Sequence, residues 1–498
     1  MSISDAVDLS AVARVLGIKT EFVNLLGGGV VLLPQRVALI GQGSSSAVYS
    51  NDKARVTSAV EVGNLYGYGS PLHLAAQKLL PANGDGLGTV PLTVYPLDDD
   101  ASGVASAGDI TPSGAQTEAA SYVVRVNNID SQAFVIPVSA TVAARTALIT
   151  AAINAEIDLP ITAVDGTTVV DTTAKWEGTS SNDIVIEVIG STTAGTSFAI
   201  TQHTGGLVNP DVDDALALVG NVWETMLINC MEIADTTTLD KFQVFGDGRY
   251  GALVRKPPVV FTGITEVSPT AAIAISDARK TDKINSQIPE PGSNDLPFVV
   301  AARAIARIAV RANNNPPFDY GSLQATGLVP GADGDQWDYT ERDLAVKGGS
   351  STIEVKDGVV NISDTVTFYH PTGDPTPAYR YVVDIVKLQN IIFNLDLIFS
   401  APEWDGAPLI PDDQATSNPA AKKPKSAVAA VAALVDSLAL NAIISDPETA
   451  KTSIQAEIDS QNPKRLNLTV TVQLAGNTNI ISVDLDFGFF FGTPQVVA

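Results

Sequence analysis

Three histidines, His73, His203 and His370, are the side chains best suited to acid–base or metal chemistry in this chain. Histidine is the usual catalytic base and a frequent zinc ligand, but a zinc site needs several His or Cys ligands at short spacing. No second His or Cys stands at ligand spacing from any of the three. We therefore expect no metal site and no catalytic residue built on them.

The turn Gly41-Gln42-Gly43 follows a short apolar run and shares two glycines with a dinucleotide-binding fingerprint. The third glycine is absent because position 46 is a serine, and no Gly-Lys-Ser/Thr phosphate loop occurs. The serines at 44–46 also lack the Gly-X-Ser-X-Gly pattern of a nucleophile elbow. We interpret the segment as a tight strand-to-helix turn and expect no cofactor.

Two acidic runs, residues 98–100 and 211–214, offer carboxylates that a hard cation such as calcium prefers. Neither run has the glycine and terminal glutamate of a calcium loop. We interpret the first as a solvated linker and the second as the acidic start of a helix, where negative charge complements the helix dipole.

The charge balance of the whole chain narrows the class of partner. The 498 residues include 30 basic and 55 acidic side chains, for a net charge of −25. A field of this sign repels phosphate backbones and anionic lipids, so we expect neither nucleic acid nor membrane as a partner. The single cysteine, Cys230, excludes a disulfide framework, and residues 1–9 lack the pattern of a signal peptide. We expect a soluble protein of the cytoplasm.

The elements that would position these residues indicate several domains, because a chain of this length exceeds a single hydrophobic core. A strand at 37–40, a helix at 71–80 and a strand at 90–95 predict the start of an α/β core. Residues 101–206 then alternate short strand-like runs with turns around one helix at 141–157. Between residues 101 and 240 only three basic residues accompany 17 acidic ones, which favours an inserted domain facing solvent.

Helical spacing returns at 211–234, followed by a strand at 242–245. Further helices are predicted at 298–312, 379–399 and 426–444, with strands at 351–355, 359–362 and 365–369. Two alternating strands, 465–473 and 479–487, flank a short turn and predict a hairpin. The fold class is therefore α+β or α/β and multidomain, with a central mixed sheet core, an inserted β-rich domain and extended amino- and carboxy-terminal arms.

The carboxy-terminal residues are the unusual feature of the sequence. No Lys or Arg follows Arg465, and the alternating run after residue 479 continues into Phe487, Phe489, Phe490 and Phe491. An apolar strand of this kind left at an exposed edge would aggregate. It is therefore either buried in its own domain or paired with another subunit.

Several segments follow one another along the chain in a characteristic order: Gly17-Ile18-Lys19-Thr20-Glu21-Phe22, Leu33-Pro34-Gln35-Arg36-Val37-Ala38-Leu39-Ile40-Gly41-Gln42-Gly43, residues 298–315, 337–345 and 348–362, and Tyr379-Arg380-Tyr381-Val382-Val383-Asp384. In their order and spacing these segments resemble Mu-like contractile phage tail sheath proteins. The resemblance spans both ends and the core, with residues 101–206 as the variable insertion. One departure is that Gly17 lacks the preceding proline common in sheaths.

The resemblance implies a structural protein that is not an enzyme and has no cofactor. Its copies stack as six-membered rings in a helical cylinder around the tail tube, and their arms add strands to the sheets of neighbouring copies. Contraction without nucleotide drives the tube through the host envelope. The implied partners are further copies of the chain, the tail tube protein, and baseplate and tail terminator proteins. The implied location is the virion tail, assembled in the host cytoplasm.

On this basis we divide the chain into an amino-terminal arm (1–35), a core (36–100 and 207–295), the outward-facing insertion (101–206), a tube-proximal carboxy-terminal sheath domain (296–487) and a carboxy-terminal arm (488–498). The candidate linking residues are Ile18, Thr20, Phe22, Phe489, Phe490, Phe491 and Val496. The candidate receiving residues are Leu468, Val470, Val472, Ile481, Val483 and Leu485, and the candidate tube-facing residues are Lys422, Lys423 and Lys425.

Two other interpretations stay open from the sequence. The sheath of a related contractile injection device would use the same subunit physics. An α/β enzyme with a β insertion is the alternative from another class, and the strand and glycine turn at 40–43 is the only feature in its favour. A strand-rich, acidic adhesin is disfavoured by the predicted helices.

Overall fold

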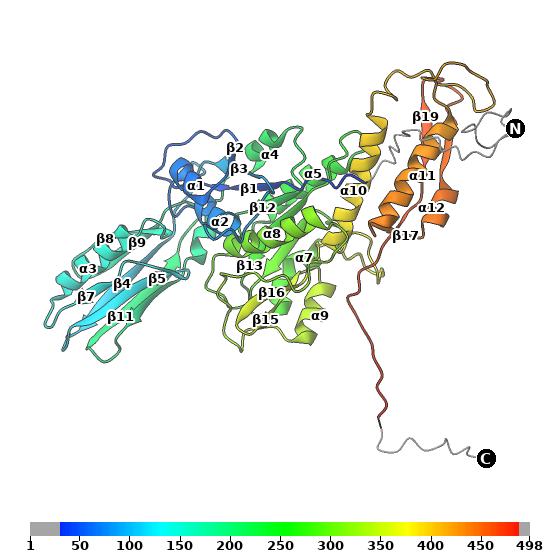
Figure 1. Cartoon of the computed structure of the whole chain (residues 1–498). Helices are drawn as coiled ribbons and strands as arrows, with labels where there is room; N and C mark the ends of the chain where they lie inside the picture. The colour runs from blue at the N-terminus through cyan, green and yellow to red at the C-terminus, as the bar shows by residue number, and fades with distance from the viewer. Residues whose placement is uncertain (1–29, 488–498) are drawn as a thin grey trace, which may run out of the picture. The chain divides into compact units, whose positions relative to one another are not determined.

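The computed structural model describes residues 30–487, and the chain divides into two compact units. Of the described residues, the first unit comprises 30–31 and Asn394–Gln473, and the second comprises Leu32–Phe393 and 474–487. Helices and several separate sheets alternate through the described residues (Figure 1). The predicted α and β multidomain fold is confirmed.

A six-stranded sheet in the order β14-β13-β12-β1-β3-β2 forms the centre of the second unit. Its strands are parallel except for β2, which runs antiparallel to β3. Five of the six strands are buried along their whole length, as expected for a parallel sheet covered on both faces. The strands are β1 (Val37–Gln42), β2 (Ala54–Val56), β3 (Leu92–Leu97), β12 (Met226–Asn229), β13 (Val259–Ile264) and β14 (Asn285–Pro289).

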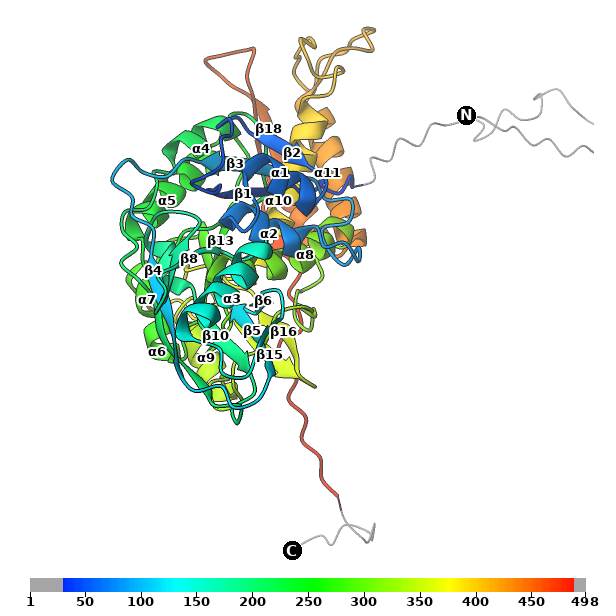
Figure 2. The same ribbon diagram turned by 90° about the vertical axis from the view of Figure 1, so that its left-hand side faces the viewer.

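Helices cover both faces of this sheet. Helices α2 (Pro71–Leu79) and α8 (Pro297–Asn314) lie on one face, and α4 (Asp213–Val219) and α5 (Thr236–Tyr250) lie on the other (Figure 2). Helix α1 (Ala59–Tyr66) packs against α2. Gly263 lets α8 approach the sheet, because a Cβ there would lie 1.6 Å from the carbonyl oxygen of Pro297.

The predicted helix at 211–234 is wrong beyond its first turns. Helix α4 ends at Val219 with Gly220 as its C-cap, and the apolar residues 226–229 form the buried strand β12. The predicted strand at 242–245 is also wrong, since it lies inside α5, where Phe242 and Phe245 fall three residues apart on one helical face. A short apolar run suits either structure, and the sheet neighbours decide between them.

The insertion between β3 and β12 consists of two antiparallel sheets and a helix. One sheet has the order β11-β4-β9-β8, and in the other β10 and β6 flank β5, which also pairs with β7. Helix α3 (Val142–Ala155) confirms the predicted helix, and a 3-10 turn lies at Thr179–Asp183. The strands are β4 (Ala107–Gly114), β5 (Ala120–Val126), β6 (Ile129–Asp130), β7 (Phe134–Ile136), β8 (Ile161–Asp165), β9 (Val170–Ala174), β10 (Ile186–Gly190) and β11 (Thr196–Thr204).

The rest of the second unit contains α6 (Pro269–Ala272), α7 (Ala274–Ala278), α9 (Tyr339–Lys347) and the antiparallel pair β15 (Thr352–Lys356) and β16 (Val359–Asp364). The predicted strand at 365–369 forms only an isolated bridge between Val366 and Tyr381. The predicted domain start at residue 296 does not coincide with a boundary between units, because α8 packs against β12 and β13. The long helix α10 (Val382–Phe399) follows.

The first unit contains α11 (Pro424–Leu440), β17 (Ile444–Ser445), α12 (Pro447–Ser453), β18 (Gln455–Ile458) and β19 (Leu466–Thr469). The predicted helix at 426–444 is confirmed, although it ends at Leu440. The predicted hairpin of 465–473 with 479–487 is wrong: β19 pairs with β18, and residues 479–487 form no strand. Strand β20 (Gln473–Leu474) lies where the chain returns to the second unit. None of the described helices has the length and apolar character of a membrane span.

Candidate assembly segments

The three histidines are held by hydrogen bonds inside the second unit. His203 is buried in the insertion between the hydroxyls of Ser106 and Thr172, at 2.8 and 3.0 Å. Burial lowers the pKa of His203 to about 4, so the ring is neutral at pH 7. His73 accepts from the backbone N–H of Gly69 at 3.1 Å. These are the contacts of structural histidines.

The glycine turn after β1 also has a packing explanation. A Cβ on Gly41 would lie 2.8 Å from the Cβ of Cys230, which is buried on the neighbouring strand's extension. Burial raises the pKa of the Cys230 thiol above its ordinary value, so a reactive thiolate is disfavoured. Among residues 30–487 no three His, Cys, Asp or Glu side chains are grouped to hold a metal ion.

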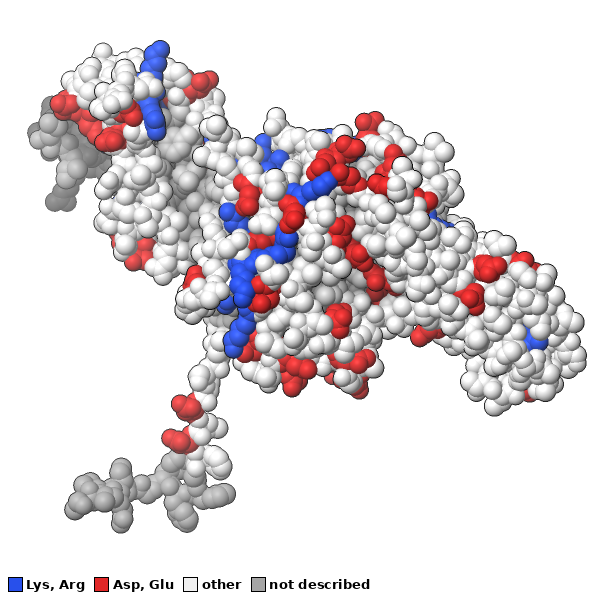
Figure 3. Space-filling view, turned by 180° about the vertical axis from the view of Figure 1, so that it is seen from behind, with Lys and Arg blue, Asp and Glu red and all other residues white. Residues whose placement is uncertain are grey.

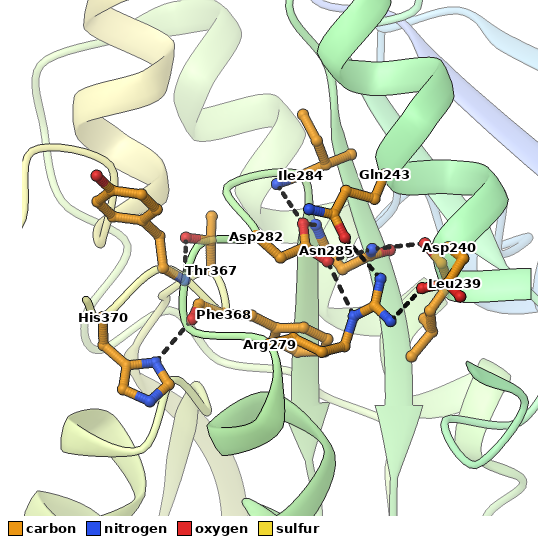
Figure 4. Close-up of polar contacts among 11 residues, drawn as sticks. Leu239, Asp240, Gln243, Arg279, Asp282, Ile284, Asn285, Thr367, Phe368 and His370 are labelled. Carbon is orange, nitrogen blue, oxygen red and sulfur yellow. Dashed lines mark hydrogen bonds and ion pairs between the residues drawn. The ribbon is translucent and has the colours of Figure 1, made fainter. Parts of the chain in front are cut away.

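A dense polar cluster shown in Figure 4 ties α5 to the loop before β14. The guanidinium of Arg279 contacts Asp282 at 3.2 Å, Asp240 at 2.5 Å and the side-chain oxygen of Gln243 at 2.8 Å. The carboxylate of Asp282 is 1% exposed and also accepts the backbone N–H of Ile284. All of these groups satisfy one another, so the cluster is structural.

The segment 480–487 is exposed and extended at the end of the described chain. It contains no strand, yet its large apolar side chains are 77 to 86% exposed: Ile480, Ile481, Val483, Leu485 and Phe487. From residue 481 onward, apolar and polar residues alternate, which places one apolar face along an extended chain. An uncovered strand of this kind is suited to pair with another chain.

The predicted receiving residues fall in two different places. Leu468 lies in β19, where it is paired with Ala456 of β18, while Val470 and Val472 follow the strand. Within the described residues β18 and β19 form a two-stranded sheet, so each strand has one edge without a partner in that sheet. Ile481, Val483 and Leu485 instead lie in the exposed segment 480–487. The structure does not bring these two groups together in one subunit's sheet.

The predicted linking residues lie outside the described range, so their role stays a prediction. They are Ile18, Thr20, Phe22, Phe489, Phe490, Phe491 and Val496.

The three predicted tube-facing lysines differ in how they are held. Lys422 is half-buried, 3.5 Å from the carboxylate of Glu403 and over the ring of Trp404. Lys423, also half-buried, donates to the carbonyl oxygen of Gln414 at 2.5 Å. Lys425 is exposed, and its ammonium contacts the carbonyl oxygen of Asp412 at 3.3 Å. Of the three, Lys425 is the most available to a partner.

The surface agrees with the acidic composition. On the face shown in Figure 3, acidic side chains are scattered widely, whereas basic side chains gather mainly in one band.

Comparison with known proteins finds similarity to tail sheath proteins. The chain is 23% identical over 461 residues to the Mu-like prophage FluMu tail sheath protein of Haemophilus influenzae, covering 89% of this chain and 91% of that protein. No family model matches. Similar solved structures are the sheath tail proteins of Listeria innocua (12% identity, 90% and 94% of the two chains, TM-score 0.48) and Desulfitobacterium hafniense (12%, 93% and 100%, 0.45). The resemblance to Mu-like tail sheath proteins is confirmed by the Haemophilus match.

Proposed function

We propose that this chain is the sheath subunit of a contractile phage tail, a structural protein of the Mu-like tail sheath family. The observation that carries the proposal is the segment 480–487. Its alternating apolar side chains extend beyond the folded body and are exposed. The similarity to the Haemophilus tail sheath protein along nearly the whole length of both chains supports it.

In this proposal the arms join copies of the chain by strand addition. The segment 480–487, continued by residues 488–498, enters a neighbouring copy, where the open edges of β18 and β19 offer backbone donors and acceptors. The amino-terminal arm, with Ile18, Thr20 and Phe22, adds a second link. A repeated contact of this head-to-tail kind, with a rise at each step, builds an open helical array.

A single link of this kind is marginal in free energy. Full burial of five large apolar side chains contributes roughly 8 to 15 kcal/mol. Ordering eight residues of extended chain costs roughly 8 to 16 kcal/mol. Because the two nearly cancel, one link is not expected to hold two isolated copies together. Tubes are expected to form where several links are made at once, which raises the effective concentration of each arm.

The proposed assembly is a stack of six-membered rings around a tail tube, joined to baseplate and terminator proteins and built in the host cytoplasm. Contraction repacks the bodies into a wider and shorter lattice while the arms stay linked, and this drives the tube through the host envelope. The lysines after Asp412, above all Lys425, are the proposed contact with the tube. The subunit acts mechanically and carries out no catalysis.

Negative-stain electron microscopy of the purified chain, with and without tail tube protein, tests the proposal. The full chain should form long hollow tubes, and a variant that ends at Asn479 should stay a folded single copy. Compact particles from the full chain under every condition would refute the sheath function. Tubes of normal length from the truncated variant would refute the role of the carboxy-terminal segment.

A further inference from the structure

Helix α10 carries three buried polar side chains on one face. Lys387, Asn390 and Asn394 follow one another at i, i+3 and i+7, the spacing of one helical stripe, and are 0, 0 and 4% exposed. The surrounding sequence of the helix is largely apolar. Because a buried amide or ammonium is destabilising without partners, the partners of this stripe show what it does.

Lys387 holds the chain just before the exposed carboxy-terminal segment. Its ammonium donates to the carbonyl oxygen of Ala475 and to the side-chain oxygen of Asn477, both at 2.6 Å, and pairs with Asp384 at 2.9 Å. The amide nitrogen of Asn477 in turn donates to the carbonyl oxygen of Pro317 at 2.8 Å. Three residues beyond Asn477 the large side chains become fully accessible, starting with Ile480 at 85% exposure. The chain is therefore fixed by hydrogen bonds at 475–477 and exposed from Ile480 onward.

The two asparagines hold the first described residues in the same manner. The side-chain oxygen of Asn390 accepts the backbone N–H of Leu33 at 2.9 Å. The amide of Asn394 brackets Val31, accepting its N–H at 3.1 Å and donating to its carbonyl oxygen at 3.0 Å. Paired donor and acceptor contacts of this kind imitate the bonds of a strand ladder and fix the direction of the backbone.

We propose that α10 is the common anchor of both linking arms. Lys387 fixes where the carboxy-terminal arm leaves the body, and Asn390 and Asn394 fix where the amino-terminal arm joins it. The inference rests on the proposed function for what lies at the far end of each arm. Its consequence is mechanical: a pull on either arm reaches the same helix, so that load passes between neighbouring copies through α10.

Limited proteolysis of the unassembled full chain tests the carboxy-terminal anchor. Chymotrypsin cleaves after leucine and aromatic residues, and the wild-type chain should be cut after Leu485 and Phe487 but resist at Leu474. Lys387→Met, which keeps the side-chain length and removes the charge, should raise the cleavage rate at Leu474 at least tenfold. The matched control is Lys347→Met, whose exposed ammonium pairs with Asp343 inside α9.

Hydrogen exchange of residues 30–36 tests the amino-terminal anchor. Asn394→Leu, of similar volume, should speed exchange of the Val31 amide at least tenfold and leave Leu474 resistant. Lys387→Met should speed cleavage at Leu474 and leave exchange of the Val31 amide at its wild-type rate. Wild-type rates at both sites, or a rise spread over the whole chain, would overturn the local anchoring. If Lys387→Met does not fold, Asn477→Ala removes one partner from outside the helix and carries the same test.

A tube readout separates this inference from the proposed function. Tubes of Asn477→Ala should dissociate on dilution at a protein concentration at least tenfold higher than wild-type tubes. If tubes of Asn477→Ala dissociate at the same concentration as wild-type tubes, the mechanical role of the anchor is refuted. If the wild-type chain forms no tubes at all, the sheath function fails, whereas the proteolysis and exchange results still decide whether α10 holds both ends.

Discussion

Arg303 of α8 and Asp85, 218 residues earlier, form an ion pair that is buried on the arginine side. The guanidinium lies 2.5 Å from the carboxylate, and the arginine side chain is 3% exposed. Arg307 contacts the same carboxylate, and the hydroxyl of Thr326 donates to it at 2.6 Å. This one carboxylate therefore connects α8, the loop after α2 and the segment after Tyr320.

Replacing the carboxylate should destabilise the second unit. Asp85→Asn leaves the buried guanidinium of Arg303 without its charged partner, and we expect a loss of about 2 kcal/mol in the free energy of unfolding at pH 7. Urea denaturation measures it, with the exposed Asp333→Asn as the matched control. Equal midpoints for Asp85→Asn and wild type would contradict the role of the pair.

The same pair predicts a loss of stability in acid. The hydrogen bond from Thr326, with Arg303 and Arg307 nearby, holds the pKa of Asp85 below its ordinary value of 3.8. A lowered folded pKa stabilises the protein above the ordinary pKa, and this contribution disappears as pH falls through the folded pKa. The difference between wild type and Asp85→Asn should therefore be full at pH 7, and it should be lost as pH falls below the ordinary carboxyl pKa and through the lowered folded pKa. A difference that is constant across this range would exclude the ionised pair.

Asp183, at the end of the 3-10 turn in the insertion, predicts the opposite trend. Burial, with Glu232 nearby, raises the pKa of Asp183 to about 7. The folded state therefore keeps a proton that the unfolded state has lost, and stability should fall as pH rises from about 4 to 7. Asp183→Asn should flatten this part of the profile in thermal unfolding, whereas the exposed Asp171→Asn on β9 should leave it unchanged. If the stability of Asp183→Asn falls with pH as steeply as that of wild type, Asp183 is not protonated in the folded state.

The alternation of segment 480–487 predicts a sided effect on assembly. Val483→Asp places a charge on the apolar face and should abolish tubes in electron microscopy. Monomer stability should change by less than about 0.5 kcal/mol, because the side chain is 77% exposed. Ser482→Asp adds the same charge to the opposite face and should assemble. Loss of tubes in both variants would indicate a general charge effect instead of strand pairing.

The proposed tube contact predicts a separation of two activities. Lys425→Glu should prevent co-sedimentation of the sheath with tail tube protein while tubes of sheath alone still form. Lys464→Glu, an equally exposed reversal in the turn between β18 and β19, should leave co-sedimentation intact. Normal co-sedimentation of Lys425→Glu with tail tube protein would refute Lys425 as a contact with the tube.

The sequence predicted local elements better than their partners. Helices α3 and α11 and the β15–β16 pair follow from periodicity and turn residues that lie next to them in the chain. Strand β12 escaped prediction because its four residues take their place between β1 and β13, which lie far away in sequence. The predicted terminal hairpin failed for the same reason, since β18, which carries no strong strand signal, pairs with β19.

The apolar terminal segment was visible in the sequence, but the contacts that attach it to the folded body were not. Alternation and the phenylalanines after residue 486 marked a strand with no obvious cover. The side chain that fixes the start of this segment, Lys387, lies on α10. From sequence alone, a lysine within an apolar helical pattern is expected to be solvated. Only the fold shows that Lys387 is buried against Ala475 and Asn477.

Strand exchange between copies is tested most sharply by a cryo-electron microscopy map of tubes formed by the full chain, at a resolution that traces the backbone of residues 480–498. We expect this stretch of each copy to run as a strand hydrogen-bonded to the β18–β19 sheet of a neighbouring copy. A map in which residues 480–498 fold back onto their own subunit, with no sheet shared between copies, would contradict it.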